Sequence, residues 1–162
     1  RLLNVQPIES AVYPQQIAFN ALPAIGDLEE NGYTNEEMKM VWETQKIFED
    51  DSILVNPTCV RIPVFYGHGE AVHVETKSPI TTDKALDLLK NAPGVCVIDQ
   101  KYPIDFPTAV RDSAGKDPVF VGRVRQDIST DRGLSMWIVS DNVRKGAALN
   151  SVQIAELLKD YL

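Results

Sequence analysis

Apolar positions recur with a helical period in one early segment of the chain. In EEMKMVWETQKIF they fall roughly along one face, which predicts an amphipathic helix over residues 35–49. Thr34 and Glu37 have the spacing of a capping box at its start, in which each side chain binds the other residue's backbone N–H. Residues 1–33 instead mix short apolar runs with prolines and glycines, which indicates extended segments and turns.

Several later segments are rich in β-branched and aromatic residues and predict strands. ILVNPTCVRIPVF and EAVHVET are two of them, joined by a bulge or tight corner at Gly67 and Gly69. The shorter run GVCVIDQ predicts a buried strand. PVFVGRVRQDI and GLSMWIVSD face each other across STDRG, which is the pattern of a hairpin.

Two further helices complete the predicted fold. KALDLLKNA follows Thr81 and Thr82, either of which can cap it, and Pro93 and Gly94 end it. NVRKGAALNSVQIAELLKDYL predicts a C-terminal helix whose apolar positions cover a wide arc and must be buried. Helices interspersed with antiparallel strands indicate an α+β domain, a mixed β-sheet covered by helices.

Composition narrows the class of protein. The chain has 162 residues, 44% hydrophobic and 24% charged, which suits one compact domain. A formal net charge of −7 argues against a nucleic-acid or anionic-membrane partner. No apolar run approaches the roughly 20 residues that span a bilayer, and no signal peptide is recognisable, so we expect a cytoplasmic protein. The chain begins at Arg1, so we expect that an upstream segment has been removed or left out.

The two cysteines, Cys59 and Cys96, form no CxxC motif and have no nearby histidine, which predicts neither a metal site nor a disulfide framework. Both lie in apolar segments, where a thiol is usually inert. Neither is therefore a candidate nucleophile.

Histidine offers a first candidate for chemistry. His68 lies between Gly67 and Gly69, which allow the backbone to take a positive φ and to approach a ligand closely. The alternative is a surface histidine in a turn. His73 lies in the alternating strand AVHVET and is interpreted as an outward-facing strand residue.

Four other polar residues are candidates with equally plain alternatives. Arg61 lies in an apolar run and needs either a bound carboxylate or an internal ion-pair partner to offset its desolvation. Glu43 and Lys46 are i,i+3 neighbours on the first predicted helix and could simply form a solvated charged face. Asn142 precedes the last helix, where it could cap the helix.

Four motifs together resemble the C-terminal half of the aspartate-β-semialdehyde dehydrogenase family, closest to its bacterial branch. They are QIAFNALPAIG, GYTNEEMKMVWETQKI, NPTCVRIPVFYGHGEAVHVET and SDNVRKGAALNSVQIAELL, in the family's order and with its spacing. The resemblance covers nearly the whole chain. A sister acyl-phosphate reductase, such as N-acetyl-γ-glutamyl-phosphate reductase, fits the ETQK and RIPVFYGHGE motifs poorly.

The resemblance implies a reaction and a role for each candidate. The family converts L-aspartyl-4-phosphate and NADPH to aspartate semialdehyde, phosphate and NADP⁺ through a cysteine thioester. By this likeness His68 is the acid/base, Arg61 binds the substrate α-carboxylate, Glu43 its amino group and Lys46 the phosphate. Asn142 resembles the polar residue near the nicotinamide amide. The role of Glu70 stays open.

The resemblance also implies an organisation. Residues 1–140 are expected to form a substrate-binding and dimerisation domain, folded like the C-terminal domain of glyceraldehyde-3-phosphate dehydrogenase, whose sheet forms a homodimer interface. Residues 141–162 are expected to pack on an N-terminal NADP-binding domain. The family's nucleophilic cysteine and glycine-rich turn are absent from this sequence, so we expect this fragment to be inactive alone. The alternative is a non-catalytic dimerisation or scaffold module.

Overall fold

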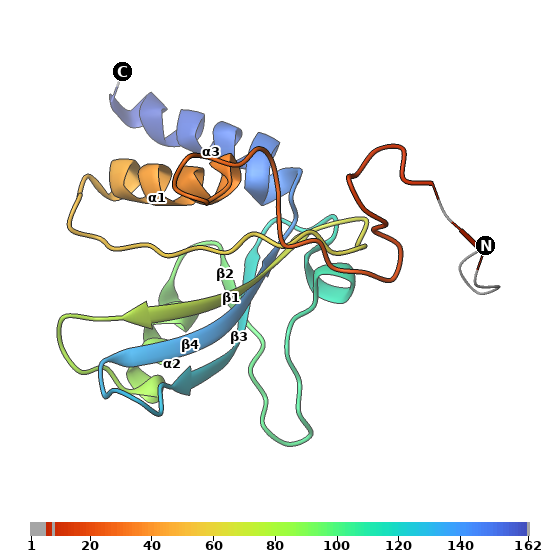
Figure 1. Cartoon of the computed structure of the whole chain (residues 1–162). Coiled ribbons are helices and arrows are strands. Elements are labelled where there is room, and N and C mark those ends of the chain that lie inside the picture. The colour runs from red at the N-terminus through yellow and green to blue at the C-terminus, as the bar shows by residue number, and fades with distance from the viewer. Residues whose placement is uncertain (1–5, 8, 162) are drawn as a thin grey trace. The chain divides into compact units, whose positions relative to one another are not determined.

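A computed structural model of the chain describes residues 6–7 and 9–161 (Figure 1). It divides into two compact units, Arg1–Pro63 and Val64–Leu162. Each unit carries part of the predicted site. They are described in turn.

The first unit contains one helix, α1 (Asn35–Phe48), within its described residues. The predicted capping box is confirmed, because the Thr34 hydroxyl accepts from the Glu37 N–H and the Glu37 carboxylate accepts from the Thr34 N–H. The helix ends where Glu49 takes a left-handed conformation (φ 51°). The predicted helix over residues 35–49 is therefore correct to within one residue.

The predicted strand over residues 53–65 is wrong. Within the described residues this segment forms only an isolated antiparallel bridge, in which Leu22 and Arg61 exchange both backbone hydrogen bonds at 2.8 and 2.9 Å. Its prolines at positions 57 and 63 lack the N–H that a continuous ladder needs. The segment is extended but is anchored at separate points.

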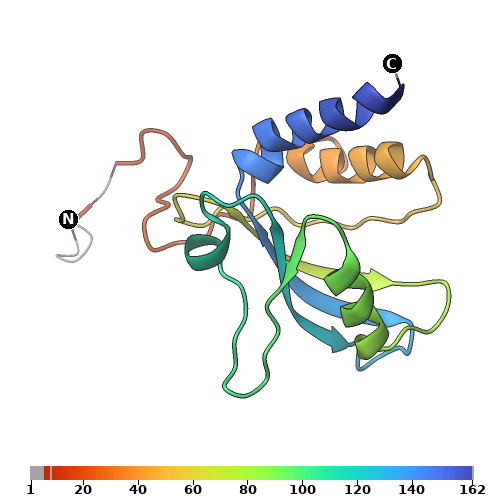
Figure 2. The ribbon, with the colours of Figure 1, turned by 180° about the vertical axis from the view of Figure 1, so that it is seen from behind.

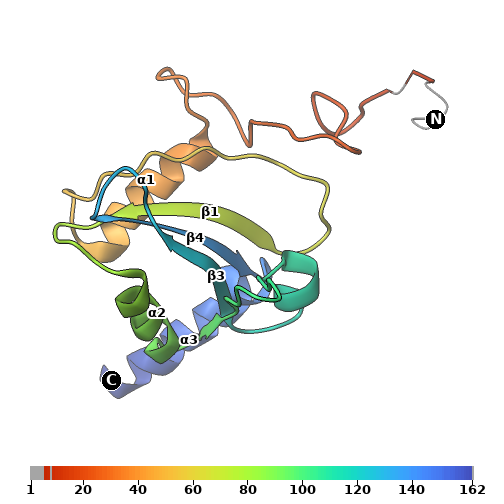
Figure 3. The same cartoon turned by 90° about the horizontal axis from the view of Figure 1, so that it is seen from below.

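The second unit is built on a mixed four-stranded sheet in the order β1-β4-β3-β2. Its strands are β1 (His68–Glu75), β2 (Val95–Val97), β3 (Val119–Gln126) and β4 (Gly133–Ser140). β2 pairs with β3 in parallel, and the other two pairings are antiparallel. Figure 3 shows β1, β4 and β3 side by side in this order. The predicted hairpin and the α+β class are confirmed.

Helix α2 (Thr82–Asn91) covers the β2 and β3 side of this sheet (Figure 2). Thr81 caps it by accepting from the Lys84 N–H. The core is a cluster in which Ala85 of α2 meets three buried side chains of the hairpin: Val121, Val124 and Leu134. Strand β1 lies at the other edge of the sheet, away from α2. Its residues are exposed except Val72, which is half-buried.

The hairpin contains an irregularity that the sequence did not predict. The register of β3 against β4 shifts between Gly122 and Arg125, where Arg123 has a positive φ of 56°. The Asp99 carboxylate accepts from the Val124 N–H at 2.9 Å and so satisfies a donor that the bulge takes out of the ladder. The bulge therefore has a side-chain partner.

The predicted C-terminal helix consists of three consecutive pieces. They are a π-helical turn η3 (Arg144–Ala148), the helix α3 (Leu149–Leu158) and a 3₁₀ turn η4 (Lys159–Tyr161). Another π-helical turn, η2 (Ala109–Ser113), follows the long loop after β2. None of the helices in the described part of the chain is long and apolar enough to cross a membrane.

Candidate functional site

In the first unit, helix α1 presents two of the predicted site residues to solvent. Glu43 and Lys46 are both exposed. Neither takes part in an ion pair among residues 6–7 and 9–161, whereas Lys39 pairs with Glu36 one turn earlier, at 2.6 Å. The Glu43 carboxylate is also near enough to Lys39 to help raise the pKa of that amine, but it forms no close ion pair with it. Both Glu43 and Lys46 therefore remain accessible to a ligand of opposite charge.

Arg61 is held by its backbone and is half-buried. Its guanidinium lies over the ring of Tyr13, with 5.4 Å from Cζ to the ring centroid, a cation–π contact. The alternative of an internal ion pair is not found, because no described carboxylate lies within ion-pair distance of Arg61. The aromatic ring leaves the guanidinium N–H donors available to a planar acceptor.

Glu37 connects α1 with the segment that leads to Arg61. Its Oε2 accepts from the Thr34 N–H and its Oε1 accepts from the Cys59 N–H, both at 2.8 Å. These backbone donors lower the pKa of the Glu37 carboxyl. Burial, with the nearby Glu37 carboxylate adding to it, raises the pKa of the Cys59 thiol, as expected for an unreactive cysteine.

In the second unit, His68 is the first residue of β1 and is exposed. The preceding Gly67 has φ 83°, and a Cβ built on it would lie 2.9 Å from the Ser113 hydroxyl and 3.1 Å from the Ser140 carbonyl oxygen. Both the backbone angle and the close packing therefore require glycine. The Gly67 N–H donates to the Asn142 side-chain oxygen at 2.9 Å.

The glycine after His68 is required by an aromatic neighbour. A Cβ built on Gly69 would lie 2.8 Å from Cζ2 of Trp137, whose indole N–H donates to the Pro107 carbonyl at 3.0 Å. On its other side, the His68 ring borders Gly146 of η3, where a built Cβ would lie 3.8 Å from the imidazole Cδ2. The ring thus lies beside the start of the C-terminal helical segment.

Asp141 performs the capping role that was the alternative for Asn142. One carboxylate oxygen of the 4%-exposed Asp141 accepts from the N–H groups of Val143 and Arg144 at 2.8 and 2.7 Å, and the other accepts from Gly115 at 2.7 Å. These donors lower the pKa of the Asp141 carboxyl. Sequence reasoning missed Asp141, although Asp is a preferred residue at a helix start.

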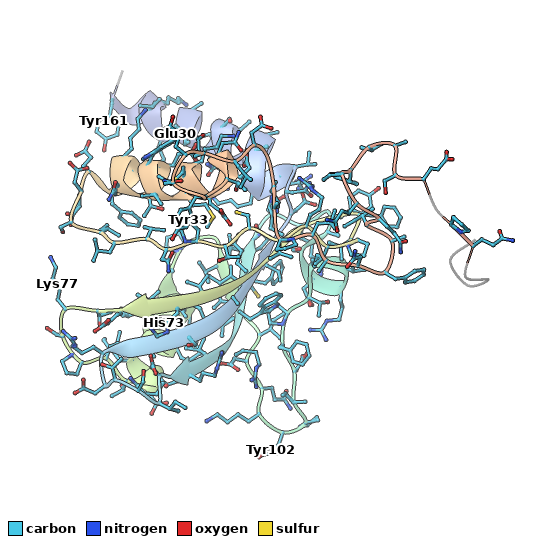
Figure 4. All side chains as sticks on the ribbon, in the orientation of Figure 1. Glu30, Tyr33, His73, Lys77, Tyr102 and Tyr161 are labelled. Atoms are coloured by element: carbon cyan, nitrogen blue, oxygen red, sulfur yellow. The ribbon has the colours of Figure 1, made fainter. Side chains whose placement is uncertain are left out.

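The remaining polar residues of β1 have structural or solvent-facing positions. His73, labelled in Figure 4, is outward-facing as predicted, and its Nε2 lies 3.3 Å from a carboxylate oxygen of Asp127. Its Nδ1 lies 3.3 Å from the Ser135 hydroxyl. Glu70 is exposed and is opposite Ile138 on β4. Among the described residues, no group of three His, Cys, Asp or Glu side chains could hold a metal ion.

The family described as "Semialdehyde dehydrogenase, dimerisation domain" matches residues 1–145. The chain belongs to this semialdehyde dehydrogenase family. An aspartate-semialdehyde dehydrogenase of Legionella pneumophila is 64% identical over 158 residues, which are 98% of this chain and 46% of that protein. The chain spans about half the length of the curated relatives it matches.

Solved structures show the same fold. The crystal structure of aspartate semialdehyde dehydrogenase II complexed with ASA, from Vibrio cholerae, is 60% identical and superimposes with a TM-score of 0.92 over 99% of this chain and 47% of that one. The aspartate semialdehyde dehydrogenase of Candida albicans with NADP is more distant, at 27% identity and a TM-score of 0.65 over 88% of this chain and 45% of that one. The resemblance found in the sequence motifs is therefore confirmed.

Proposed function

We propose that this chain is the substrate-binding and dimerisation part of an aspartate-semialdehyde dehydrogenase. The reaction is the NADPH-dependent reductive dephosphorylation of L-aspartyl-4-phosphate to L-aspartate 4-semialdehyde, a step of amino-acid biosynthesis. The observation that carries the proposal is the close likeness to relatives of that name along nearly the whole chain, 64% in the Legionella protein. The sequence holds no cysteine in the family's nucleophile motif, and the chain spans about half of those relatives, so the thiol nucleophile is proposed to belong to another part of the protein.

His68 is proposed as the acid/base. Its imidazole is exposed, and it forms no hydrogen bond with another described side chain, so both ring nitrogens are available to a reacting group. Gly67 and Asn142 fix the turn that presents it. A positioned imidazole can take the proton of an attacking thiol and return it to the developing oxyanion, which typically accelerates a step about 10²- to 10⁴-fold.

The first unit supplies the groups proposed to bind the substrate. The guanidinium of Arg61 matches the planar α-carboxylate, which it can hold with two parallel hydrogen bonds. Glu43 matches the substrate ammonium group, and Lys46, one turn further along α1, matches the phosphate. The support is that these three charges have no ion-pair partners among the described residues.

Asn142 is proposed to contact NADP. Its side-chain oxygen is already used by Gly67, whereas its Nδ2 group donates to no acceptor in the described chain, so the residue fits the carbonyl oxygen of a carboxamide such as that of nicotinamide. NADPH supplies the hydride when bound. The sequence holds no glycine-rich turn for its pyrophosphate, so most of the cofactor would be bound by the nucleotide-binding domain.

Two interfaces follow from the same proposal. The dimerisation family favours a homodimer formed through the sheet, and β1 is consistent with this because almost all of its residues are exposed. Residues 141–162 are proposed to pack on the nucleotide-binding domain, since four apolar side chains of α3 are more than half exposed: Val152, Ile154, Leu157 and Leu158. A cytoplasmic location is proposed because the reaction needs NADPH and both cysteines are free thiols.

The test is the substitution His68→Ala in the protein that joins this chain to its nucleotide-binding domain. We expect kcat to fall about 10²- to 10⁴-fold, with a small change in the KM for aspartate semialdehyde. The control is His73→Ala, which removes the other histidine and leaves kcat unchanged. NADP-dependent turnover that survives His68→Ala would contradict the role of His68. A wild-type protein that dimerises but never turns over would favour the scaffold alternative.

A further inference from the structure

We infer that Glu37 is a positioning residue for substrate binding: its carboxylate fixes the segment carrying Arg61 against the helix carrying Glu43 and Lys46. The inference rests on the proposed function, because the roles of these three charges come from it. Glu37 itself would touch no substrate. Glu37 would act by fixing the position of the Arg61 guanidinium relative to α1.

The geometry of the Glu37 carboxylate carries the inference. Glu37 lies in the first turn of α1 and is only 7% exposed, although it is charged. One of its oxygens completes the capping box with Thr34, and the other accepts the backbone N–H of Cys59 at 2.8 Å. Cys59 precedes Arg61 by two residues, so the second bond reaches the segment next to the guanidinium.

A capping box alone does not account for this arrangement. Capping requires a single contact from the glutamate, to the N–H of the N-cap residue. The bond to Cys59 joins residues 22 positions apart in the chain and adds nothing to the helix end. The carboxylate therefore has two functions, and the second is to connect the helix with the extended segment.

The extended segment depends on such separate anchors because it lacks a ladder. Tyr33 donates to the Asn56 side chain at 2.8 Å, and Gln45 donates to the Ile53 carbonyl at 3.0 Å, both well before Arg61. The Leu22 bridge fixes the backbone of Arg61 itself to another extended segment. Among the hydrogen bonds of the described residues, two join α1 to the stretch from Cys59 to Arg61: that of Glu37, and a weak one from the Cys59 thiol to the Met40 sulfur at 3.8 Å. Of these two, only that of Glu37 holds the backbone of the stretch.

The chemistry explains why the anchor is a glutamate. An ionised carboxylate offers acceptors on both oxygens, and here each meets a backbone donor. An uncharged glutamine has one carbonyl oxygen, so its amide nitrogen would face either the Thr34 or the Cys59 N–H. A buried donor left without an acceptor is costly, so even this isosteric change weakens one of the two contacts.

The experiment compares Glu37→Ala and Glu37→Gln with Thr34→Ala in the full protein that contains the nucleotide-binding domain. Thr34→Ala weakens the helix cap but leaves the Glu37–Cys59 bond in place, so it is the matched control. We expect Glu37→Ala to raise the KM for aspartate semialdehyde about tenfold, the size of one lost charge-assisted hydrogen bond. The KM for NADP⁺ should stay within about twofold of the wild type.

Three results are informative. A raised KM in Glu37→Ala, a smaller rise in Glu37→Gln and none in Thr34→Ala supports the inference. Equal effects in Thr34→Ala and Glu37→Ala overturn it, because helix capping would then explain both. An unchanged KM in both Glu37 variants also overturns it. Melting temperatures identify a variant that fails to fold, and in that case Glu37→Gln decides.

Hydrogen exchange of the Cys59 amide separates this inference from the proposed function. Protection that is lost in Glu37→Ala and retained in Thr34→Ala supports the anchor whether or not the protein turns over aspartate semialdehyde. If the Cys59 amide exchanges as fast in the wild type as in Glu37→Ala, the result contradicts the anchor. A wild-type protein without turnover instead contradicts the proposed function.

Discussion

The side-chain oxygen of Asn142 accepts a hydrogen bond from the backbone N–H of Gly67 at 2.9 Å, across 75 positions of the chain. Asn142 follows the end of β4, and Gly67 lies in the turn just before β1. Because His68 follows Gly67 directly, Asn142 holds the turn that presents His68. Asn142 is thus in a position to affect His68 and, under the proposed function, a bound cofactor.

Substitutions of Asn142 can separate these two roles. Asn142→Ala removes both the acceptor for Gly67 and the free Nδ2 donor, whereas Asn142→Asp keeps an acceptor and replaces the donor by a second, negatively charged oxygen. We expect both variants to raise the KM for NADP⁺, and Asn142→Ala to shift the ring resonances of His68 in heteronuclear NMR spectra. A His68 signal that is unchanged in Asn142→Ala would show that the bond does not position the turn.

Gly67→Ala is expected to destabilise the protein and to displace His68. A non-glycine residue in the left-handed region costs about 1 to 2 kcal/mol, and the added methyl group would lie 3.0 Å from the Ala109 Cβ. Gly94→Ala is the matched control, because Gly94 has a φ of 73° but open space around its Cβ position. Chemical denaturation should therefore show a larger loss for Gly67→Ala. Equal losses of stability in Gly67→Ala and Gly94→Ala would mean that the backbone conformation alone, and not the close packing at Gly67, causes the destabilisation.

Local signals explain which parts of the fold and site could be predicted. The capping box of Thr34 and Glu37, the α2 start at Thr81 and the β3–β4 hairpin are each encoded within a few neighbouring residues. The strand predicted over residues 53–65 has the composition of a strand, but strand formation needs a partner that composition does not reveal. The hydrogen bond between Cys59 and Glu37 and that between Gly67 and Asn142 join segments that are distant in the chain, so no local spacing of residues could predict them.

The alternative interpretation of Asn142 as a helix cap is wrong for a different reason. Asp141 and Asn142 are adjacent and both are preferred at helix starts, so residue type alone cannot choose between them. The backbone at the end of β4 decides, because it turns Asp141 toward the N–H groups of η3 and Asn142 toward Gly67.

The core under α2 offers a stability prediction. Leu134 is 3% exposed and packs in the cluster with Ala85, Val121 and Val124, so Leu134→Ala should lower the free energy of unfolding by about 2 to 5 kcal/mol. Leu88→Ala removes the same atoms from α2 at a position that is 52% exposed. This substitution should change the free energy of unfolding by about 0.5 kcal/mol or less. Urea denaturation measures both. A small effect at Leu134 would contradict the core as described.

Acid should weaken the structure partly through Asp141. The pKa of this carboxyl is lowered from its ordinary value of 3.8 in the folded state, chiefly by the N–H groups of Arg144 and Gly115. A lowered folded-state pKa means that the unfolded chain binds the proton more readily. The stability that Asp141 contributes is therefore complete above the ordinary pKa, and it is lost as the pH falls below 3.8 toward the folded-state value.

Asp141→Asn tests this linkage, because asparagine cannot titrate. At neutral pH the variant should be less stable than the wild type, since three backbone donors would then share one carbonyl oxygen. Below pH 3.8 its melting temperature should fall less steeply than that of the wild type, so the two curves converge. The slope does not vanish, because Glu37, Asp112 and Asp127 also have lowered pKa values. Parallel melting curves across the acid range would show that Asp141 is not one of the titrating groups.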